Sequence, residues 1–159
     1  MRHLRTALSI LAFATFVSSA AADGKPGWLT NYKQAQEEAK SGKKMMLMNF
    51  TGSDWCGWCI KLDREVFSKP EFKEYASKNL VLMEIDFPRA KKLSETEKSQ
   101  NEQLAEQHQV QGFPTIVVMN SDGKKIGELS YESGVPAGSG EPRATPAAFI
   151  ASLEKLRKG

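Results

Sequence analysis

Apolar positions along the chain follow two patterns that alternate from one segment to the next. Residues 45–50 and 80–86 are nearly continuous apolar runs, as expected for strands that are covered on both faces. Around these runs, apolar residues recur at helical spacing. The predicted elements, in order, are a helix at 31–41, a strand at 45–50, a helix from 56 to about 67, a helical piece from Pro70, a strand at 80–86, a helix from 95 to about 108, strands at 115–119 and 124–131, and a helix from 146.

Several of these boundaries carry recognisable signals. Ser94 to Glu97 forms a capping box before the helix at 95. Thr145 followed by Pro146 is a typical helix start, and Asn120 to Gly123 predicts a hairpin turn. Because helices and strands alternate early and a hairpin comes late, the order predicts an α/β sandwich with a mixed sheet.

The first 22 residues have the pattern of a secretory signal peptide. Two arginines precede a short apolar stretch at 7–17, and Ala20 and Ala22 form an A-x-A cleavage site. The stretch is about half of the ~20 apolar residues that span a bilayer, so we expect cleavage rather than anchoring. Residues 23–159 would then form one mature domain that is exported, periplasmic or secreted, and does not span the membrane.

Cleavage also changes the charge balance. The full chain has 22 basic and 19 acidic residues, and loss of Arg2 and Arg5 leaves 20 against 19. A nearly neutral domain gives no reason to expect nucleic acid or an anionic membrane as a partner. The mature length suits one domain with one core.

The chain has two cysteines, Cys56 and Cys59. A disulfide that closes so short a loop restrains little of the unfolded chain, so the pair is a poor structural staple. Zinc needs about four ligands, and His108 is the only histidine after residue 22; haem attachment needs histidine where Ile60 stands. We therefore expect no metal or cofactor, and we interpret the pair as a redox-active dithiol rather than an inert one.

Placement gives the two thiols different roles. If the helix begins at Cys56, its sulfur lies against free backbone N–H groups and the positive end of the helix dipole, which favour the thiolate. Cys56 would then be the attacking nucleophile. Cys59, one turn further in and shielded from solvent, would resolve the mixed disulfide by attacking Cys56.

Residues 43–157 resemble the thioredoxin superfamily. The likeness rests on an apolar strand, then W-C-G-W-C at 55–59 opening a helix, and V-Q-G-F-P-T at 110–115. It implies a three-layer thioredoxin-like α/β sandwich, with a central mixed sheet of about four strands flanked by helices. It also implies a cis peptide bond before Pro114, facing the dithiol, where the free backbone groups of Phe113 would meet an extended substrate.

Substrate contacts are expected on both sides of the dithiol. Aromatic side chains beside a nucleophile contact partners more often than they fill the core, and a glycine lets a substrate chain approach closely. The candidate substrate-binding residues are Trp55, Gly57, Trp58, Gly112, Phe113 and Pro114.

Two charges that thioredoxins usually carry are missing. Asn49 stands at the position of their buried aspartate, and Leu82 at the position of the neighbouring lysine. It is consistent that both charges are missing, because a buried lysine without the aspartate as its partner would be unfavourable. Asn49 cannot take the proton from Cys59, so water or another acid must do so. Asp54 and Glu84 are the candidates, although each is also explained as a solvated surface charge.

Two loops are expected to shape the choice of partner. In the implied topology, the strands that end at residues 86 and 131 run parallel to the strand that ends at Phe50. The segments that follow them, 87–93 and 132–144, would therefore emerge where Cys56 lies. Loops often carry function, and the alternative is that these two are solvent-exposed loops with no role in partner choice.

The residues around the dithiol also bear on the direction of electron transfer. Gly57 and Trp58 bring no charge that would stabilise a thiolate, and Asp54 would oppose ionisation. We expect a reductase or isomerase whose partners are protein disulfides or dithiols, with a membrane protein as electron donor. The alternatives are a peptide-binding or chaperone module, and a maturation factor for one client.

Overall fold

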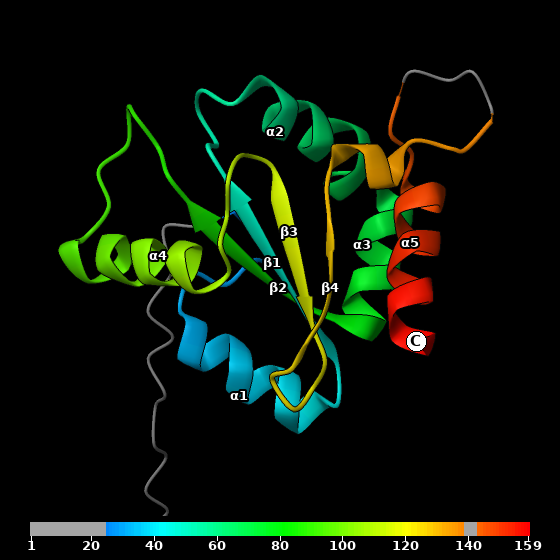
Figure 1. Cartoon of the computed structure of the whole chain (residues 1–159), viewed down its shortest axis with the longest axis horizontal. Helices are drawn as coiled ribbons and strands as arrows, with labels where there is room; N and C mark the ends of the chain where they lie inside the picture. Colours follow the sequence, from blue (N-terminus) through cyan, green and yellow to red (C-terminus); the bar gives the residue numbers. More distant parts are fainter. Residues whose placement is uncertain (1–24, 139–142) are drawn as a thin grey trace, which may run out of the picture.

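The computed structural model describes residues 25–138 and 143–159, so the signal peptide expected at 1–22 lies outside the described residues. The centre of the domain is a sheet with the strand order β2-β1-β3-β4 (Figure 1). β2 runs parallel to β1, whereas β3 is antiparallel to β1 and β4 is antiparallel to β3. The prediction of a mixed sheet of about four strands is confirmed. The strands are β1 Met45–Thr51, β2 Leu80–Asp86, β3 Thr115–Met119 and β4 Lys125–Leu129.

Helices cover both faces of this sheet (Figure 1). Two of them, α1 Tyr32–Gly42 and α4 Glu95–Gln107, lie on one face. The other face carries α2 Gly57–Leu62, α3 Pro70–Asn79 and α5 Pro146–Lys158. A π-helical segment, η1 Asp63–Phe67, continues α2, and a 3-10 turn, η2 Tyr131–Gly134, follows β4. This is the predicted three-layer sandwich.

Alternation along β1 divides the core into two clusters. Met46 and Met48 pack with α1 and α4, whereas Leu47 packs with α2, α3 and α5. Every residue of β1 is buried, which explains why its sequence shows no polar alternation. The same alternation places Asn49 and its β2 partner Glu84 on the face covered by α2.

Aromatic rings fill the layer between the sheet and the helices α3 and α5. The rings of Phe67 and Phe72 lie 5.0 Å apart, and Phe149 lies 5.5 Å from Phe67. Trp28, near the start of the described chain, packs on Phe67 at 5.2 Å. Because Phe67 is the last residue of η1, this cluster anchors the helical segment that carries the two cysteines.

Helix starts are capped as predicted, except that the capping box expected at Ser94 to Glu97 forms only its Ser94 hydrogen bond. The side chains of Asn31, Ser94 and Thr145 accept backbone hydrogen bonds at the starts of α1, α4 and α5. Among the described residues, no helix is both long and apolar enough to cross a bilayer.

The end of the last strand differs from the prediction. The return strand expected to reach Tyr131 ends at Leu129, and Tyr131 opens η2 instead of extending the sheet. Its hydroxyl group donates to a carboxylate oxygen of Glu65 at 2.6 Å and accepts the backbone N–H of Ala144 at 3.2 Å. These two bonds turn the chain back toward α2, so the segment expected to be a loop begins with a helical turn.

Candidate functional site: a disulfide at a helix start

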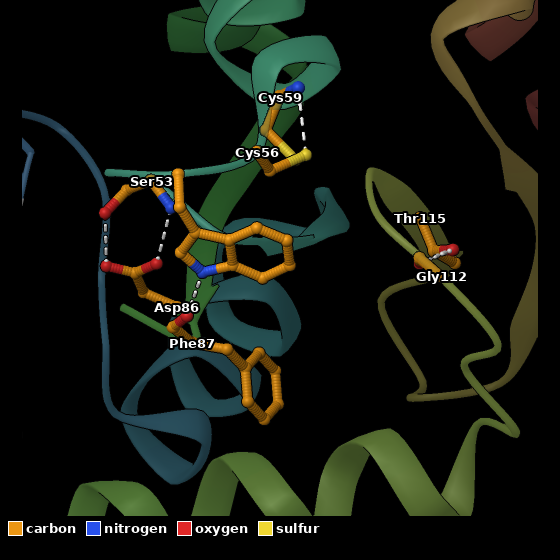
Figure 2. The surroundings of a disulfide bond; sticks show 8 residues. Ser53, Cys56, Cys59, Asp86, Phe87, Gly112 and Thr115 are labelled. Carbon is orange, nitrogen blue, oxygen red and sulfur yellow. Dashed lines mark hydrogen bonds between the residues drawn. A yellow bond between two sulfur atoms is a disulfide. The ribbon is translucent and has the colours of Figure 1, made fainter. Parts of the chain in front are cut away.

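Cys56 and Cys59 form a disulfide just after the end of β1 (Figure 2). The helix was predicted to begin at Cys56; α2 begins one residue later, and Cys56 is its N-cap, with its Sγ accepting the backbone N–H of Cys59 at 3.2 Å. Its own N–H donates to the carbonyl oxygen of Gly52 at 2.8 Å. Since η1 continues α2, the Sγ lies at the positive end of a longer helical segment.

The two cysteines differ less in solvent exposure than the sequence suggests. Cys59 is shielded as expected, with 6% of its surface exposed, but Cys56 is also covered, at 7%. The difference between them is their position relative to the helix. Cys56 caps the helix, whereas Cys59 lies inside its first turn.

The turn between β1 and Cys56 is fixed by β2. The backbone N–H and the hydroxyl group of Ser53 both donate to the Asp86 carboxylate, at 2.9 and 2.6 Å (Figure 2). Asn101 of α4 donates to the carbonyl oxygen of Asp86 at 2.9 Å. Three elements therefore meet at the turn that delivers Cys56.

Trp55 is held over this turn. A Cβ atom added to Gly52 would come within 2.4–2.8 Å of the indole atoms, so the glycine lets the ring lie directly on the backbone. The indole N–H of Trp55 donates to the carbonyl oxygen of Phe87 at 2.7 Å (Figure 2). The guanidinium group of Arg89 lies 4.0 Å from the ring centre.

Asp54 holds the segment 87–93. Its carboxylate accepts the backbone N–H groups of Arg89 at 3.0 Å and of Ala90 at 2.7 Å. These hydrogen bonds hold the pKa of Asp54 below its usual value. A carboxylate occupied in this way is a poor proton acceptor, so Asp54 is no longer a candidate for that role.

A second aromatic contact lies on the other side of the cysteines. Trp58 packs against Tyr131 at 4.9 Å, and the ammonium group of Lys61 lies 4.9 Å from the Trp58 ring and 5.0 Å from that of Tyr131. The segment that follows β4 therefore contacts the cysteine helix at its start. Of the two segments expected to flank the disulfide, 87–93 contacts the neighbouring Trp55, whereas the contact to Trp58 comes from Tyr131, one residue before the segment 132–144.

The proline turn has the expected conformation. The peptide bond between Phe113 and Pro114 is cis, and the ring of Phe113 lies 5.9 Å from that of Trp55. The Thr115 hydroxyl donates to the carbonyl oxygen of Gly112 at 2.8 Å and closes the turn (Figure 2).

Two predicted contact positions border open space. A Cβ atom added to Gly57 or to Gly112 would meet no heavy atom within 4 Å. The fold itself does not need glycine there, which fits positions that a second chain approaches. Trp55 and Trp58 are 37% and 56% exposed, so neither belongs to the core.

Several residues that organise the site were not singled out from the sequence. Ser53, Arg89 and Tyr131 act through partners that are more than thirty residues away along the chain, whereas Gly52 acts through the nearby Trp55. The one local signal is the Gly-Ser-Asp run after β1, whose residue types are typical of tight turns. In residues 25–138 and 143–159, no group of three or more His, Cys, Asp or Glu side chains could hold a metal ion.

Comparison with known proteins agrees with this geometry. The family model for a thioredoxin-like domain matches residues 32–137. The disulfide bond reductase DsbH of Chlamydia pneumoniae is 36% identical over 104 residues, which are 65% of this chain and 63% of the relative. The chain therefore spans less than two thirds of the length of that relative.

Solved structures give the same result. An oxidoreductase named DsbH superposes with a TM-score of 0.71 and 31% identity, over 94% of this chain and 95% of that one. A thioredoxin from Thermus thermophilus superposes with a TM-score of 0.52 at 19% identity, over 80% of this chain and 82% of that one, which shows a shared fold.

Proposed function

This chain belongs to the family of thioredoxin-like domains, and from this premise we propose that it is a thiol–disulfide oxidoreductase that reduces the disulfides of exported proteins. Cys56 is the nucleophile in this proposal and Cys59 the resolving thiol. The observation that carries it is the place of the Cys56 Sγ, at a helix start and hydrogen-bonded to a backbone N–H group.

The reaction consists of two thiol–disulfide exchanges. In the reduced protein, the Cys56 thiolate attacks one sulfur of a substrate disulfide, forms a mixed disulfide and releases the first substrate thiolate. Cys59 then loses its proton and attacks Cys56, which reforms the disulfide and releases the second thiolate. Two electrons pass from the protein to the substrate, and each released thiolate takes up a proton.

The surface around the disulfide suits a polypeptide substrate. Trp55 and Trp58 are exposed on either side of the cysteines, and space is open above Gly57 and Gly112. An extended chain could lie along the cis-proline turn between the two indoles, with its backbone close to Phe113. Protein disulfides rather than small disulfides are therefore the proposed substrates.

Two observations support the reducing direction. The relative from Chlamydia pneumoniae is named a disulfide bond reductase. In addition, the side chain of Lys61 is directed at the rings of Trp58 and Tyr131, so its charge serves the aromatic contact. A cation beside the thiolate would stabilise the reduced form, so a cysteine pair without such a cation forms a less oxidising disulfide. We expect a reduction potential closer to about −270 mV than to the about −120 mV of strong dithiol oxidants.

Export and an external source of electrons complete the proposal. The signal-like pattern of residues 1–22 supports a mature protein in the periplasm or outside the cell. A reductase there must be reduced again by electrons that cross the membrane, so we propose a membrane dithiol protein as donor. Recovery of the protein from the cytoplasm with residues 1–22 intact would rule out this location.

Activity toward a protein disulfide tests the function. The reduced protein should reduce insulin in the presence of a thiol donor, and Cys56→Ser should abolish this reaction. Cys59→Ser should lose turnover but accumulate a mixed disulfide through Cys56 that is visible by mass. Full reduction of insulin by Cys56→Ser would leave a peptide-binding module as the better account.

A further inference from the structure

A polar cavity lies beneath the resolving cysteine. It has a volume of about 220 Å³, and its walls include Cys59 from α2, Asn49 from β1 and Glu84 from β2. Glu84 is the direct neighbour of Asn49 across the two parallel strands. Among the described residues, no donor reaches the buried Oδ1 atom of Asn49. The space is large enough for several water molecules between these polar groups.

Glu84 carries a carboxylate that lines this cavity and interacts with the charge of Lys25. Asp63 also lines it, but its carboxylate is ion-paired with Lys25 and accepts the hydroxyl group of Ser68 at 2.9 Å. Asp54 is occupied by the backbone of the segment 87–93. Glu84 is therefore the acid best placed to exchange a proton with Cys59.

We propose that Glu84 accepts the proton of Cys59 through the water of this cavity when Cys59 resolves the mixed disulfide. The inference rests on the proposed thiol–disulfide exchange at Cys56. It assigns to β2 the role that thioredoxins give to an aspartate at the position of Asn49. Moving the acid from β1 to the paired position of β2 keeps it on the same side of the sheet.

The Cys59 thiol gives its proton to the Glu84 carboxylate, and the resulting thiolate attacks the Sγ of Cys56. The bond between Cys56 and the substrate sulfur breaks as the bond between the two cysteines forms. Both cysteines are then oxidised, and the substrate leaves as a thiolate. When the disulfide is reduced again, the protonated Glu84 returns its proton to Cys59.

The charges around Glu84 suit a proton acceptor that works above the ordinary range of carboxylates. Burial raises the pKa of Glu84, and the neighbouring carboxylates of Asp86 and Glu97 act in the same direction. The positive charges of Lys25 and Lys91 oppose this rise. A carboxylate whose pKa is moved toward that of a thiol takes its proton more readily.

The ammonium group of Lys25 and the carboxylate of Glu84 influence each other's pKa. Burial lowers the pKa of Lys25 to about 8, and the charge of Glu84 partly offsets the change. Lys25 also pairs with Asp63, so the three groups form one partly buried charge cluster that lines the same cavity as Cys59.

Stopped-flow reaction of the reduced protein with an aromatic disulfide, 5,5′-dithiobis(2-nitrobenzoate), separates the two exchanges. Attack by Cys56 releases the first coloured thiolate, and attack by Cys59 releases the second. The second phase is intramolecular, so it reports resolution without requiring a physiological substrate. In Glu84→Gln, we expect the second phase to slow about tenfold or more near pH 7, and the first to change less than about twofold.

The pH profile and a relocated acid distinguish proton transfer from packing. In the wild type, the rate of the second phase should rise as Glu84 loses its proton, and this inflection should vanish in Glu84→Gln. Adding Asn49→Asp to Glu84→Gln should restore most of the rate, because residue 49 lines the same cavity. The matched control is Glu74→Gln, an exposed glutamate on α3 that should behave as the wild type.

Two results would overturn the inference. One is a second phase in Glu84→Gln with the rate and pH profile of the wild type. The other is a slowed second phase that Asn49→Asp does not restore. If the wild type fails to reduce insulin while its two colour phases remain normal, the proposed function fails and the inference about Glu84 stands.

Discussion

Trp58 is an exposed aromatic residue for which we propose a role in substrate recognition rather than in the core of the fold. It is 56% exposed and contacts both the ring of Tyr131 and the ammonium group of Lys61. A ring fixed in this way loses little conformational entropy when a partner covers it. Residues of this kind dominate binding energies at interfaces.

Replacing Trp58 should therefore weaken the binding of large substrates only. Trp58→Ala should lower kcat/KM for reduction of insulin about tenfold, which corresponds to ~1.4 kcal/mol of binding energy. Its free energy of unfolding should change by less than about 1 kcal/mol. Trp58→Phe, which keeps a ring against Tyr131, should lose less. An equal loss toward a small aromatic disulfide would contradict this role.

At the scale of elements, the segment 87–93 is attached to the active-site turn at two points. Trp55 donates to the carbonyl oxygen of Phe87, and Asp54 accepts backbone N–H groups of Arg89 and Ala90. Both bonds join residues more than thirty positions apart, so a change in this segment reaches the turn before Cys56.

Removing the Asp54 carboxylate should release this segment. Trypsin should cleave after Arg89 several times faster in Asp54→Ala than in the wild type, as followed by mass spectrometry, because local opening exposes the peptide bond. Asp122→Ala, in the exposed hairpin turn, is the control. An unchanged cleavage rate would show that the indole of Trp55 holds the segment alone.

The hydrogen bonds between the Asp54 carboxylate and the segment 87–93 should depend on pH. The folded pKa of Asp54 is lowered from 3.8, so its contribution is present above that value and is lost as the pH falls through the lowered pKa. Protection of the Arg89 and Ala90 amides from hydrogen exchange should therefore weaken only at strongly acidic pH.

The sequence predicted elements best where the local pattern decides the structure. β1 and β2 were recognised because a strand that is buried on both faces needs a nearly continuous apolar run. The last strand is shorter than predicted, although Tyr131 fits a strand by propensity. Its hydroxyl is bound instead to Glu65, 66 residues away, and no local pattern records such a contact.

In the candidate site, too, some residues could be predicted from local motifs and others could not. The cysteines, the aromatic residues beside them and the proline turn belong to short motifs, so their positions followed from the sequence. The roles of Gly52 and Arg89 depend on how the Trp55 ring lies on each of them, which only the assembled fold determines. Glu84 was one of two candidate acids, and the cavity beneath Cys59 selects it.

For the molecule as a whole, a buried acid that serves catalysis should reduce stability. The folded pKa of Glu84 lies above 4.5, so its contribution to stability is fully present below the unfolded value and is lost as the pH rises through the folded pKa. Glu84→Gln should therefore be at least as stable as the wild type at pH 7.5, and the difference should shrink toward pH 4.5. Urea unfolding at both pH values measures this. A constant loss of stability at both would indicate a packing role for the side chain.

The central claim is that the helix start holds Cys56 as the reactive thiolate. The most direct test is alkylation of the fully reduced protein by iodoacetamide at neutral pH, with peptide mapping to show which thiol reacts. We predict that Cys56 is modified first and faster than free cysteine, while Cys59 is modified slowly. Modification of Cys59 first, or of both thiols no faster than free cysteine, would contradict the account.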